Sequence, residues 1–417
     1  MALRTFPNGF RLGIQETDNE RLACVAVHVV GGSQSETNYQ SGVGEFLSRL
    51  LCYGTKNYPS YELLQKRFKK DGIVFESDCK AENLLLTCLC QSDKIESAIT
   101  LLSEILFDSN FAIDAADDVR NSMLADISSL HESPSYLLTK LTNNTMFSRT
   151  GLANPRFGTT TTIERMKAED AKEYLDKILT PKNTIITVAG SLDSDDVYDV
   201  VMKKFYSRFI ENSEYKKLKY VAHVDTVKQT VITRNKKLNQ SRIMLSFPSL
   251  DYRHVKRHAL TLALPLVLSN LKSYLNADHY FHSEKLEQKK FVANGRISFE
   301  LIVDAEHTKE YLAHVTKFLK EDVLTLDEET FEYQKNIYIT NLLEKYDSVK
   351  NLAVKEAKEI AVNKQTFSLN SELLNVSMMS VDDAKEVLGE TIDFAKATLC
   401  YLGLPMDEVE LEEIINN

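Results

Sequence analysis

The stretch SGVGEFLSRLLCYGT, at residues 41–55, places two oppositely charged side chains one helical turn apart. Glu45 and Arg49 are separated by four positions, so on a helix they share one face and can pair. A carboxylate can bind a metal ion or a proton, but a guanidinium stays protonated and has no lone pair for a metal. Ser48, between them, is not a base. The pattern favours an ion pair over a hydrolytic metal centre.

Two histidine pairs also have types and spacing that could bind a metal. His254 and His258, in DYRHVKRH, lie one helical turn apart, but basic residues flank them and no glutamate stands between them. They favour a solvated, basic helix face. His279 and His282, in DHYFHSE, lie among acidic residues in a segment that predicts a polar loop. The sequence contains no glycine-rich phosphate loop and no nucleophile elbow.

Composition limits the classes of function. The chain has 417 residues, of which 43% are hydrophobic and 26% charged, as in soluble globular proteins with a sizeable core. Its formal charge of -10 argues against nucleic acid or an anionic membrane as the main partner. No apolar run approaches the roughly 20 residues of a spanning helix.

The cysteines and the first residues bear on the compartment. The six cysteines lie in apolar surroundings without a Cys-x-x-Cys pair, which predicts buried, reduced thiols. The opening MALRTFPNGF has neither a signal-peptide core nor an Arg/Ser-rich transit segment. We expect a chain made without a leader, or a processed form.

The chain repeats itself. EDAKEYL at 169–175 recurs as DDAKEVL at 382–388, where Asp170 maps to Asp383 at an offset of 383 − 170 = 213. NTIITVAG ends at Gly190 and KATLCYLG at Gly403, again at 403 − 190 = 213. An acidic helix start follows each glycine and suits the helix macrodipole. Each half is therefore expected to end as helix, strand, glycine turn and acidic helix.

Hydrophobic periodicity predicts the remaining elements. The expected strands span residues 9–14, 23–30, 72–76, 83–90, 227–233, 241–247 and 295–304. The expected helices span residues 42–52, 59–69, 95–106, 115–130, 255–274 and 308–324. This order predicts an α+β fold of two similar α/β domains, with mixed or antiparallel sheets covered by helices. We place the domains at 1–211 and 227–417, joined by a polar linker at about 212–226.

Several segments together carry a family resemblance. FPNGFRL, the GGSQSE turn, GVGEFLSRLLCYGT and NTIITVAG occur in an order that resembles the pitrilysin-type family of inverted zinc peptidases. That family includes mitochondrial processing peptidase and the core proteins of respiratory complex III. The resemblance covers nearly the whole chain and implies a shared two-domain fold.

The resemblance also implies what became of the catalytic site. Family enzymes carry His-x-x-Glu-His on the first long helix, with two zinc-binding histidines and a general base. On that frame Glu45 and Arg49 take the histidine positions, Ser48 that of the base, and Asp126 that of the distal glutamate (126 − 49 = 77). The resemblance thus implies no zinc, no cofactor and no catalytic residue. Our hypothesis is that Glu45, Arg49 and Asp126 form an ion-pair cluster instead of a metal site.

Two further segments resemble one particular member of the family. RTGLANPRFG at 149–158 and KLEQKKFVANGRISFELIVD at 285–304 resemble core protein 2 of the cytochrome bc1 complex. This implies a non-catalytic structural subunit on the matrix side of the mitochondrial inner membrane. It would pair with a second homologous core subunit, contact other complex III subunits, and be peripheral to the membrane through these partners. No nucleic-acid partner is expected.

Two alternatives remain open. The first alternative, ranked below the core subunit, is a non-catalytic half of a heterodimeric zinc processing peptidase, for example in a bacterial cytoplasm. The absence of an Arg…Gly-Leu-Ala-Tyr substrate-gripping element from 268–291 counts against it. The other alternative is a stand-alone peptide-binding module that uses the former substrate cleft.

Overall fold

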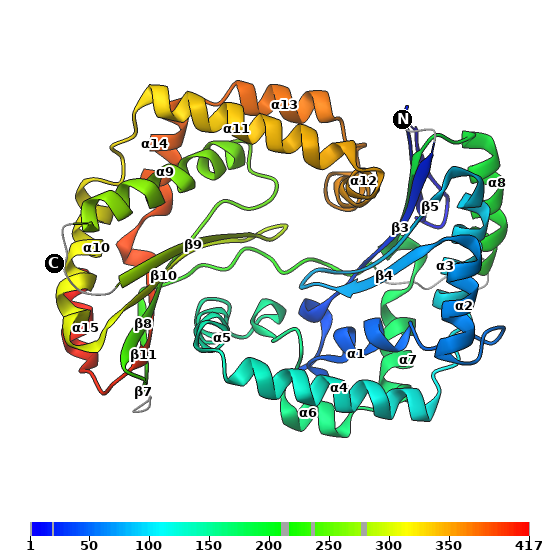
Figure 1. The fold of residues 1–417 in the computed structure, drawn as a ribbon, viewed down its shortest axis with the longest axis horizontal. Coiled ribbons are helices and arrows are strands. Elements are labelled where there is room, and N and C mark those ends of the chain that lie inside the picture. The colour runs from blue at the N-terminus through cyan, green and yellow to red at the C-terminus, as the bar shows by residue number, and fades with distance from the viewer. Residues whose placement is uncertain (1, 19–20, 210–216, 235–237, 277–281, 417) are drawn as a thin grey trace. The chain divides into compact units, whose positions relative to one another are not determined.

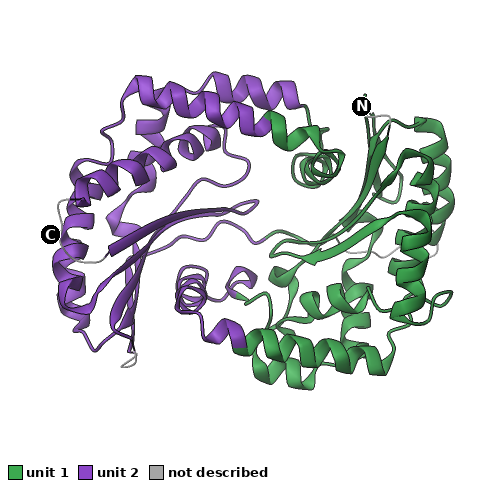
Figure 2. Ribbon diagram, viewed as in Figure 1, with its two compact units in different colours: residues 1–128, 154–220, 343–368 green, residues 129–153, 221–342, 369–417 purple. Residues whose placement is uncertain are grey.

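The chain forms two compact units, each of which borrows a segment from the other half of the sequence. The computed structural model describes residues 2–18, 21–209, 217–234, 238–276 and 282–416. Unit 1 contains 1–128, 154–220 and 343–368, and unit 2 contains 129–153, 221–342 and 369–417 (Figure 2). The predicted domains, 1–211 and 227–417, are continuous in sequence. They therefore do not include the exchange of segments, in which 129–153 belong to unit 2 and 343–368 to unit 1. Residues 217–226, within the predicted linker, contain neither helix nor strand.

Unit 1 is built on a six-stranded sheet in the order β1-β2-β6-β3-β5-β4. β2 runs parallel to β6, and the other neighbours are antiparallel, so the sheet is mixed, as predicted. The strands are β1 (Ala2–Thr5), β2 (Arg11–Glu16), β3 (Leu22–Val30), β4 (Val74–Cys79), β5 (Asn83–Gln91) and β6 (Thr184–Gly190).

Helices cover both faces of this sheet. On β3, Val25 and Val27 belong to the main core with α3 and α8, whereas Cys24 and Ala26 face the opposite way and pack against Ala353 of α12. Figure 1 shows α3 and α8 on one side of this sheet and α12 on the other. The sheet is therefore covered on its second face by a helix from the far end of the sequence. The helices of unit 1 are α1 (Val43–Leu50), α2 (Tyr61–Asp71), α3 (Ile95–Phe107), α4 (Ile113–His131), α6 (Thr160–Arg165), α7 (Ala168–Ile178), α8 (Ser194–Lys204) and α12 (Val349–Asn363).

Unit 2 repeats this plan on a five-stranded mixed sheet, in the order β7-β11-β8-β10-β9. Its strands are β7 (Gln229–Arg234), β8 (Gln240–Pro248), β9 (His282–Lys290), β10 (Gly295–Asp304) and β11 (Thr398–Gly403). Leu138 of the exchanged helix α5 packs on Met244 and Cys400 of the sheet. The helices are α5 (Pro134–Met146), α9 (Arg257–Leu275), α10 (Thr308–Glu321), α11 (Glu328–Asp347), α13 (Leu369–Ser377), α14 (Val381–Thr391) and α15 (Glu408–Asn416). No described helix is long and apolar enough to cross a membrane.

The internal repeat extends from sequence to structure. α7 and α14 begin and end 213 positions apart, and β6 and β11 end at Gly190 and Gly403. Each of these strands lies between one parallel and one antiparallel neighbour. The predicted fold class, two α/β domains with mixed sheets and helices, is confirmed.

Two local predictions were wrong. His258 lies in α9 but is only 3% exposed, close to the ring of Tyr338, because the inner face of this helix is buried and not solvated. The predicted polar loop at DHYFHSE is, from His282 onward, the edge strand β9, where Tyr311 donates a hydrogen bond to Glu284. His279 lies outside the described residues.

Candidate functional site

Helix α1 is fixed at its start by a buried carboxylate from the GGSQSE turn. Gly42 has φ 92°, and a Cβ there would lie 2.8 Å from the Cα of Gly158, so only glycine fits. Glu36 accepts hydrogen bonds from the backbone N–H groups of Gly42 at 2.7 Å and Gly44 at 2.9 Å. Burial raises the pKa of Glu36 to about 8, although these hydrogen bonds oppose the shift. Glu36 therefore sets the position of α1.

The sequence of α1 then determines which side chains face the site. Phe46, Leu47 and Leu50 are buried in the main core of unit 1. Ser48 is 2% exposed, and its hydroxyl lies 3.0 Å from the hydroxyl of Ser77 on β4. This hydroxyl hydrogen-bonds to the neighbouring strand. A serine hydroxyl is not a general base, so Ser48 cannot take the role of the glutamate.

Arg49 lies between the two other residues of the predicted cluster. Its Nε donates to Glu45 Oε1 at 2.9 Å, and its Nη2 is 2.7 Å from Asp126 Oδ2 on α4. Its Nη1 also donates to the hydroxyl of Ser122, one turn before Asp126, at 3.1 Å. Burial works to lower the pKa of Arg49, but the hydrogen bonds that it donates to the Glu45 and Asp126 carboxylates outweigh this effect and raise the pKa above its usual value. The guanidinium thus links α1 to α4.

A second arginine, which sequence reasoning missed, completes the network. Arg156 Nε donates to Glu45 Oε2 at 2.9 Å, and its Nη2 donates to Asp78 Oδ1 on β4 at 2.5 Å. The ring of Phe157 lies 5.7 Å from Cζ of Arg49 and 5.4 Å from Cζ of Arg156, within range of cation–π attraction. Arg156 and Phe157 both belong to the RTGLANPRFG segment. No spacing rule in the sequence connects that segment with α1.

The residues at this site do not fit a zinc ion. Both carboxylate oxygens of Glu45 accept hydrogen bonds from guanidinium groups, and Asp126 pairs with Arg49. A zinc site needs three or four deprotonated N, O or S donors, and here two permanent cations lie among the carboxylates. Among the described residues, no group of three or more His, Cys, Asp or Glu side chains is placed to hold a metal. The arrangement can cross-link four chain segments by charge-assisted hydrogen bonds.

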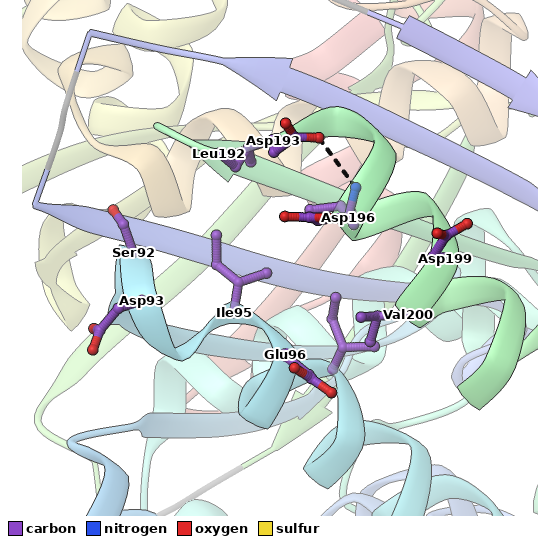
Figure 3. A pocket seen from close by; sticks show the side chains of 11 residues that line it. Ser92, Asp93, Ile95, Glu96, Leu192, Asp193, Asp196, Asp199 and Val200 are labelled. Atoms are coloured by element: carbon purple, nitrogen blue, oxygen red, sulfur yellow. Dashed lines mark hydrogen bonds between the residues drawn. The ribbon is translucent and has the colours of Figure 1, made fainter.

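A separate hollow in unit 1, of about 460 Å³, lies between the starts of α3 and α8 (Figure 3). Its rim is acidic and includes Asp93, Glu96 and Asp193. Asp193 accepts hydrogen bonds from the backbone N–H groups of Asp195 at 2.8 Å and Asp196 at 3.2 Å. Acidic side chains of this kind stabilise helix N-termini. This role explains why carboxylates gather here, and no bound ligand is needed to explain them.

Two family models match most of the chain. Residues 12–160 match the family model for insulinase (peptidase family M16), and residues 165–338 match the model for the peptidase M16 inactive domain. The cytochrome b-c1 complex subunit 1 of Caenorhabditis elegans is 21% identical over 91% of this chain and 84% of its own length.

Two other relatives each match slightly less than half of this chain. The mitochondrial-processing peptidase subunit beta of Dictyostelium discoideum is 23% identical over 49% of this chain. The non-peptidase homolog YmxG of Helicobacter pylori is 28% identical over 43%. The matches span only 43% and 41% of the lengths of these two relatives.

Solved structures share the fold along the whole chain. A peptidase M16 inactive domain from Pseudomonas fluorescens superposes with a TM-score of 0.84 at 14% identity, over 98% of this chain and 99% of that one. A chain of complex III from Candida albicans superposes with a TM-score of 0.77 at 16% identity, over 99% of both chains. The protein belongs to the insulinase family of peptidases, family M16, and its residues 165–338 match that family's inactive domain.

Proposed function

We propose that this protein is a non-catalytic structural subunit, similar to the core subunits of the cytochrome bc1 complex. The observation that carries the proposal is the guanidinium of Arg49, hydrogen-bonded to Glu45 and ion-paired with Asp126. On the family frame these are the positions of three zinc ligands. A site held together by its own charges can support a fold, but it supplies neither a Lewis acid nor a base.

The relatives favour a place in complex III. The C. elegans protein that aligns with 91% of this chain is named cytochrome b-c1 complex subunit 1. The short segments in the sequence resemble core protein 2 instead, so the choice between the two core positions stays a prediction. In this proposal the protein lies on the matrix side of the mitochondrial inner membrane and pairs with a homologous core subunit. Haem and quinone chemistry belongs to other subunits.

Purification from the native source tests the proposal directly. The full chain would be tagged, extracted in mild detergent, and the chains that co-purify would be identified by mass spectrometry. We expect a second M16 homologue together with cytochrome subunits. Recovery as a lone monomer, or with proteins unrelated to respiration, would contradict a core-subunit role.

A second candidate is the non-catalytic half of a heterodimeric zinc processing peptidase. It is favoured by the relatives named mitochondrial-processing peptidase subunit beta and non-peptidase homolog. In that case the co-purifying chain is a single homologue with an intact His-x-x-Glu-His helix, and the pair cleaves peptides although neither chain does alone. A bacterial cytoplasm is then the expected location.

Zinc titration of the isolated chain separates both candidates from an active peptidase. We expect no stoichiometric zinc binding by calorimetry and no peptidase activity that a chelator abolishes. One zinc ion bound per chain with submicromolar affinity would overturn the assignment of α1 as a non-metal site.

A further inference from the structure

The sheet of unit 2 lacks an outer strand that the sheet of unit 1 has. β6 and β11 are equivalent in the internal repeat, and each lies beside a parallel strand, β2 in unit 1 and β7 in unit 2. In unit 1 a further strand, β1, pairs antiparallel with the outer side of β2. In unit 2 no described strand pairs with the outer side of β7, which ends the sheet (Figure 1).

The outer side of β7 therefore presents open backbone groups. Gln229 donates its backbone N–H to the carbonyl of Ala397 at 3.0 Å, so its own N–H and C=O point towards β11. Because these groups alternate along a strand, those of Thr230 and Ile232 point outward. An open row of this kind is a template for pairing with another strand.

The repeat defines the register that a strand would take there. β7 pairs with β11 from Gln229, and β2 pairs with β6 from Arg11, at positions of β11 and β6 that are 213 residues apart. Thr230 thus corresponds to Leu12, which pairs with Arg4 of β1. A strand bound to β7 in the same register has one residue opposite Thr230, in the place of Arg4.

On the face of α5, unit 2 has room for an apolar side chain. In unit 1, Leu3 of β1 packs with the cluster that includes Ile360 of α12. Leu3 pairs with Gly13, whose equivalent in unit 2 is Val231, and Val231 packs in the cluster under α5. A hollow of about 240 Å³ lies beside it, lined by Leu137, Leu141, Thr233 and Leu402 among others.

On the face of α15, an apolar side chain replaces a charge. In unit 1, Nη2 of Arg4 lies 3.6 Å from the carboxylate of Asp195 on α8. Asp193 caps α8 through the N–H of Asp195, and Asp407 caps α15 through that of Val409, so Val409 takes the place of Asp195. Val409 is 59% exposed. Exposed apolar side chains continue on either side of it in the chain, at Leu404 and Val227.

β7 also lacks the charges that protect the other outer strands. Residues 229–233 contain no charged residue and no proline, and Arg234 is the last residue of the strand. β1 contains Arg4, β4 contains Glu76 and Asp78, and β9 contains several lysines and glutamates. Such charges discourage pairing with other chains, so their absence from β7 fits an edge that a partner covers.

From these observations we infer that the outer edge of β7 binds an extended, apolar segment of a partner protein as an antiparallel strand, in the position that β1 takes in unit 1. Hydrogen bonds to the backbone of Thr230 and Ile232 hold the segment, and its alternate side chains face α5 and α15. The edge is separate from the arginine network, which contacts β4, the equivalent of β9 at the opposite edge. The inference does not depend on the proposed function.

The peptide acetyl-Lys-Ala-Leu-Val-Thr-Lys-amide tests the site by ligand-observed NMR with the full chain. It contains the β1 sequence with valine in the place of Arg4, to suit Val409. We expect saturable binding. N-methylation of its valine removes the N–H that bonds to Thr230 and should weaken binding at least about tenfold. N-methylation of its leucine, whose N–H points away from β7, is the matched control and should leave binding unchanged.

Variants of the protein give the second test. Ile232→Pro removes an outward N–H but none that bonds to β11, so it should abolish peptide binding while the melting temperature changes little. Val231→Pro removes an N–H that bonds to β11 and should lower the melting temperature. Val409→Asp, at an exposed position, installs the unit 1 residue and should weaken binding of the valine peptide about threefold. If Ile232→Pro unfolds the chain, Val409→Asp decides.

Three results would overturn the proposal. The first is no binding of the valine peptide, and the second is binding that valine N-methylation or a folded Ile232→Pro variant leaves unchanged. The third is a dimer of the parent chain in light scattering that Ile232→Pro converts to a monomer, because a second copy of the chain would then occupy the edge.

Discussion

At the scale of single residues, the site is held together by two arginines. Arg49 and Arg156 share the carboxylate of Glu45, whose side chain is 6% exposed. Removing one cation leaves a buried carboxylate with a single partner, and the loss is larger than at the surface because water cannot replace the missing donor. The arginines therefore stabilise the fold, whichever partners the chain has.

Arg49→Ala should lower the free energy of unfolding by about 1–3 kcal/mol, because it leaves Glu45 and Asp126 without that cation. Its side chain is 25% exposed, so the loss stays below that of a fully buried pair. Urea denaturation measures it. Lys94→Ala is the control, since it removes an exposed ion pair with Asp93 that contributes little to stability. Equal losses in both variants would mean that the network contributes nothing to stability.

Glu36 should make stability depend on pH. Its folded pKa of about 8 lies above the ordinary 4.5, so the folded state binds a proton more tightly than the unfolded state. Its contribution is complete below about pH 4.5 and is lost as pH rises towards 8, with a slope of up to about 1.4 kcal/mol per pH unit. Urea midpoints between about pH 5 and 8 measure this slope.

Glu36→Gln should remove that part of the slope, because the amide does not titrate. Glu356, whose pKa burial raises to about 7, contributes a slope of the same sign, so only the difference between variant and parent is diagnostic. Glu62→Gln, at a fully exposed position of α2, should leave the slope unchanged. Parallel curves for the parent and Glu36→Gln would show that the carboxylate is ionised in the folded state.

At this scale the sequence predicted part of the site. The spacing of Glu45 and Arg49 on one helix is local, and Asp126 followed from the family frame. Arg156 and Asp78 could not be found in this way, because a loop and a strand reach Glu45 only through tertiary folding. His258 was misjudged because basic neighbours in sequence do not reveal which helix face is buried.

At the scale of elements, the exchanged helix α12 limits the size of the side chains on the part of the sheet that it covers. Gly13 of β2 lies under this helix, where a Cβ would be 2.5 Å from Cδ1 of Ile360 and 3.0 Å from Cγ2 of Thr187. The contact between β2 and α12 is therefore close enough to require glycine. Periodicity predicted a strand at 9–14 but no helix at 349–363, and it cannot tell which sheet a helix covers.

Gly13→Ala should lower the free energy of unfolding by about 1–3 kcal/mol through overpacking. Gly389→Ala is the matched control: it lies inside α14 with open space at its Cβ, and should raise stability by about 0.5–1 kcal/mol. Thermal unfolding of both variants gives the comparison. A neutral Gly13→Ala would show that α12 can move away from the sheet at little cost.

At the scale of the whole molecule, neither half of the sequence contains a complete unit. Residues 1–220 lack α12, which covers Cys24, Ala26 and Leu85, and residues 221–417 lack α5, which covers Met244 and Cys400. Each half alone would expose an apolar sheet face to water.

The two halves, produced separately, should therefore aggregate or bind hydrophobic dyes, whereas co-expression should give a soluble complex with the helical content of the intact chain. A chain cut within 217–226 after folding serves as the control and should stay together in gel filtration. Two soluble, monomeric halves with protected backbone amides would contradict the exchange of helices.

The arginine network also determines what would be needed to build a zinc site at this position. Glu45→His would put an imidazole between two guanidiniums, and Arg49→His would still leave Arg156 bonded to Glu45. Each first substitution would leave a buried charge without its partner. A zinc site could therefore be built at this position only by several substitutions made together.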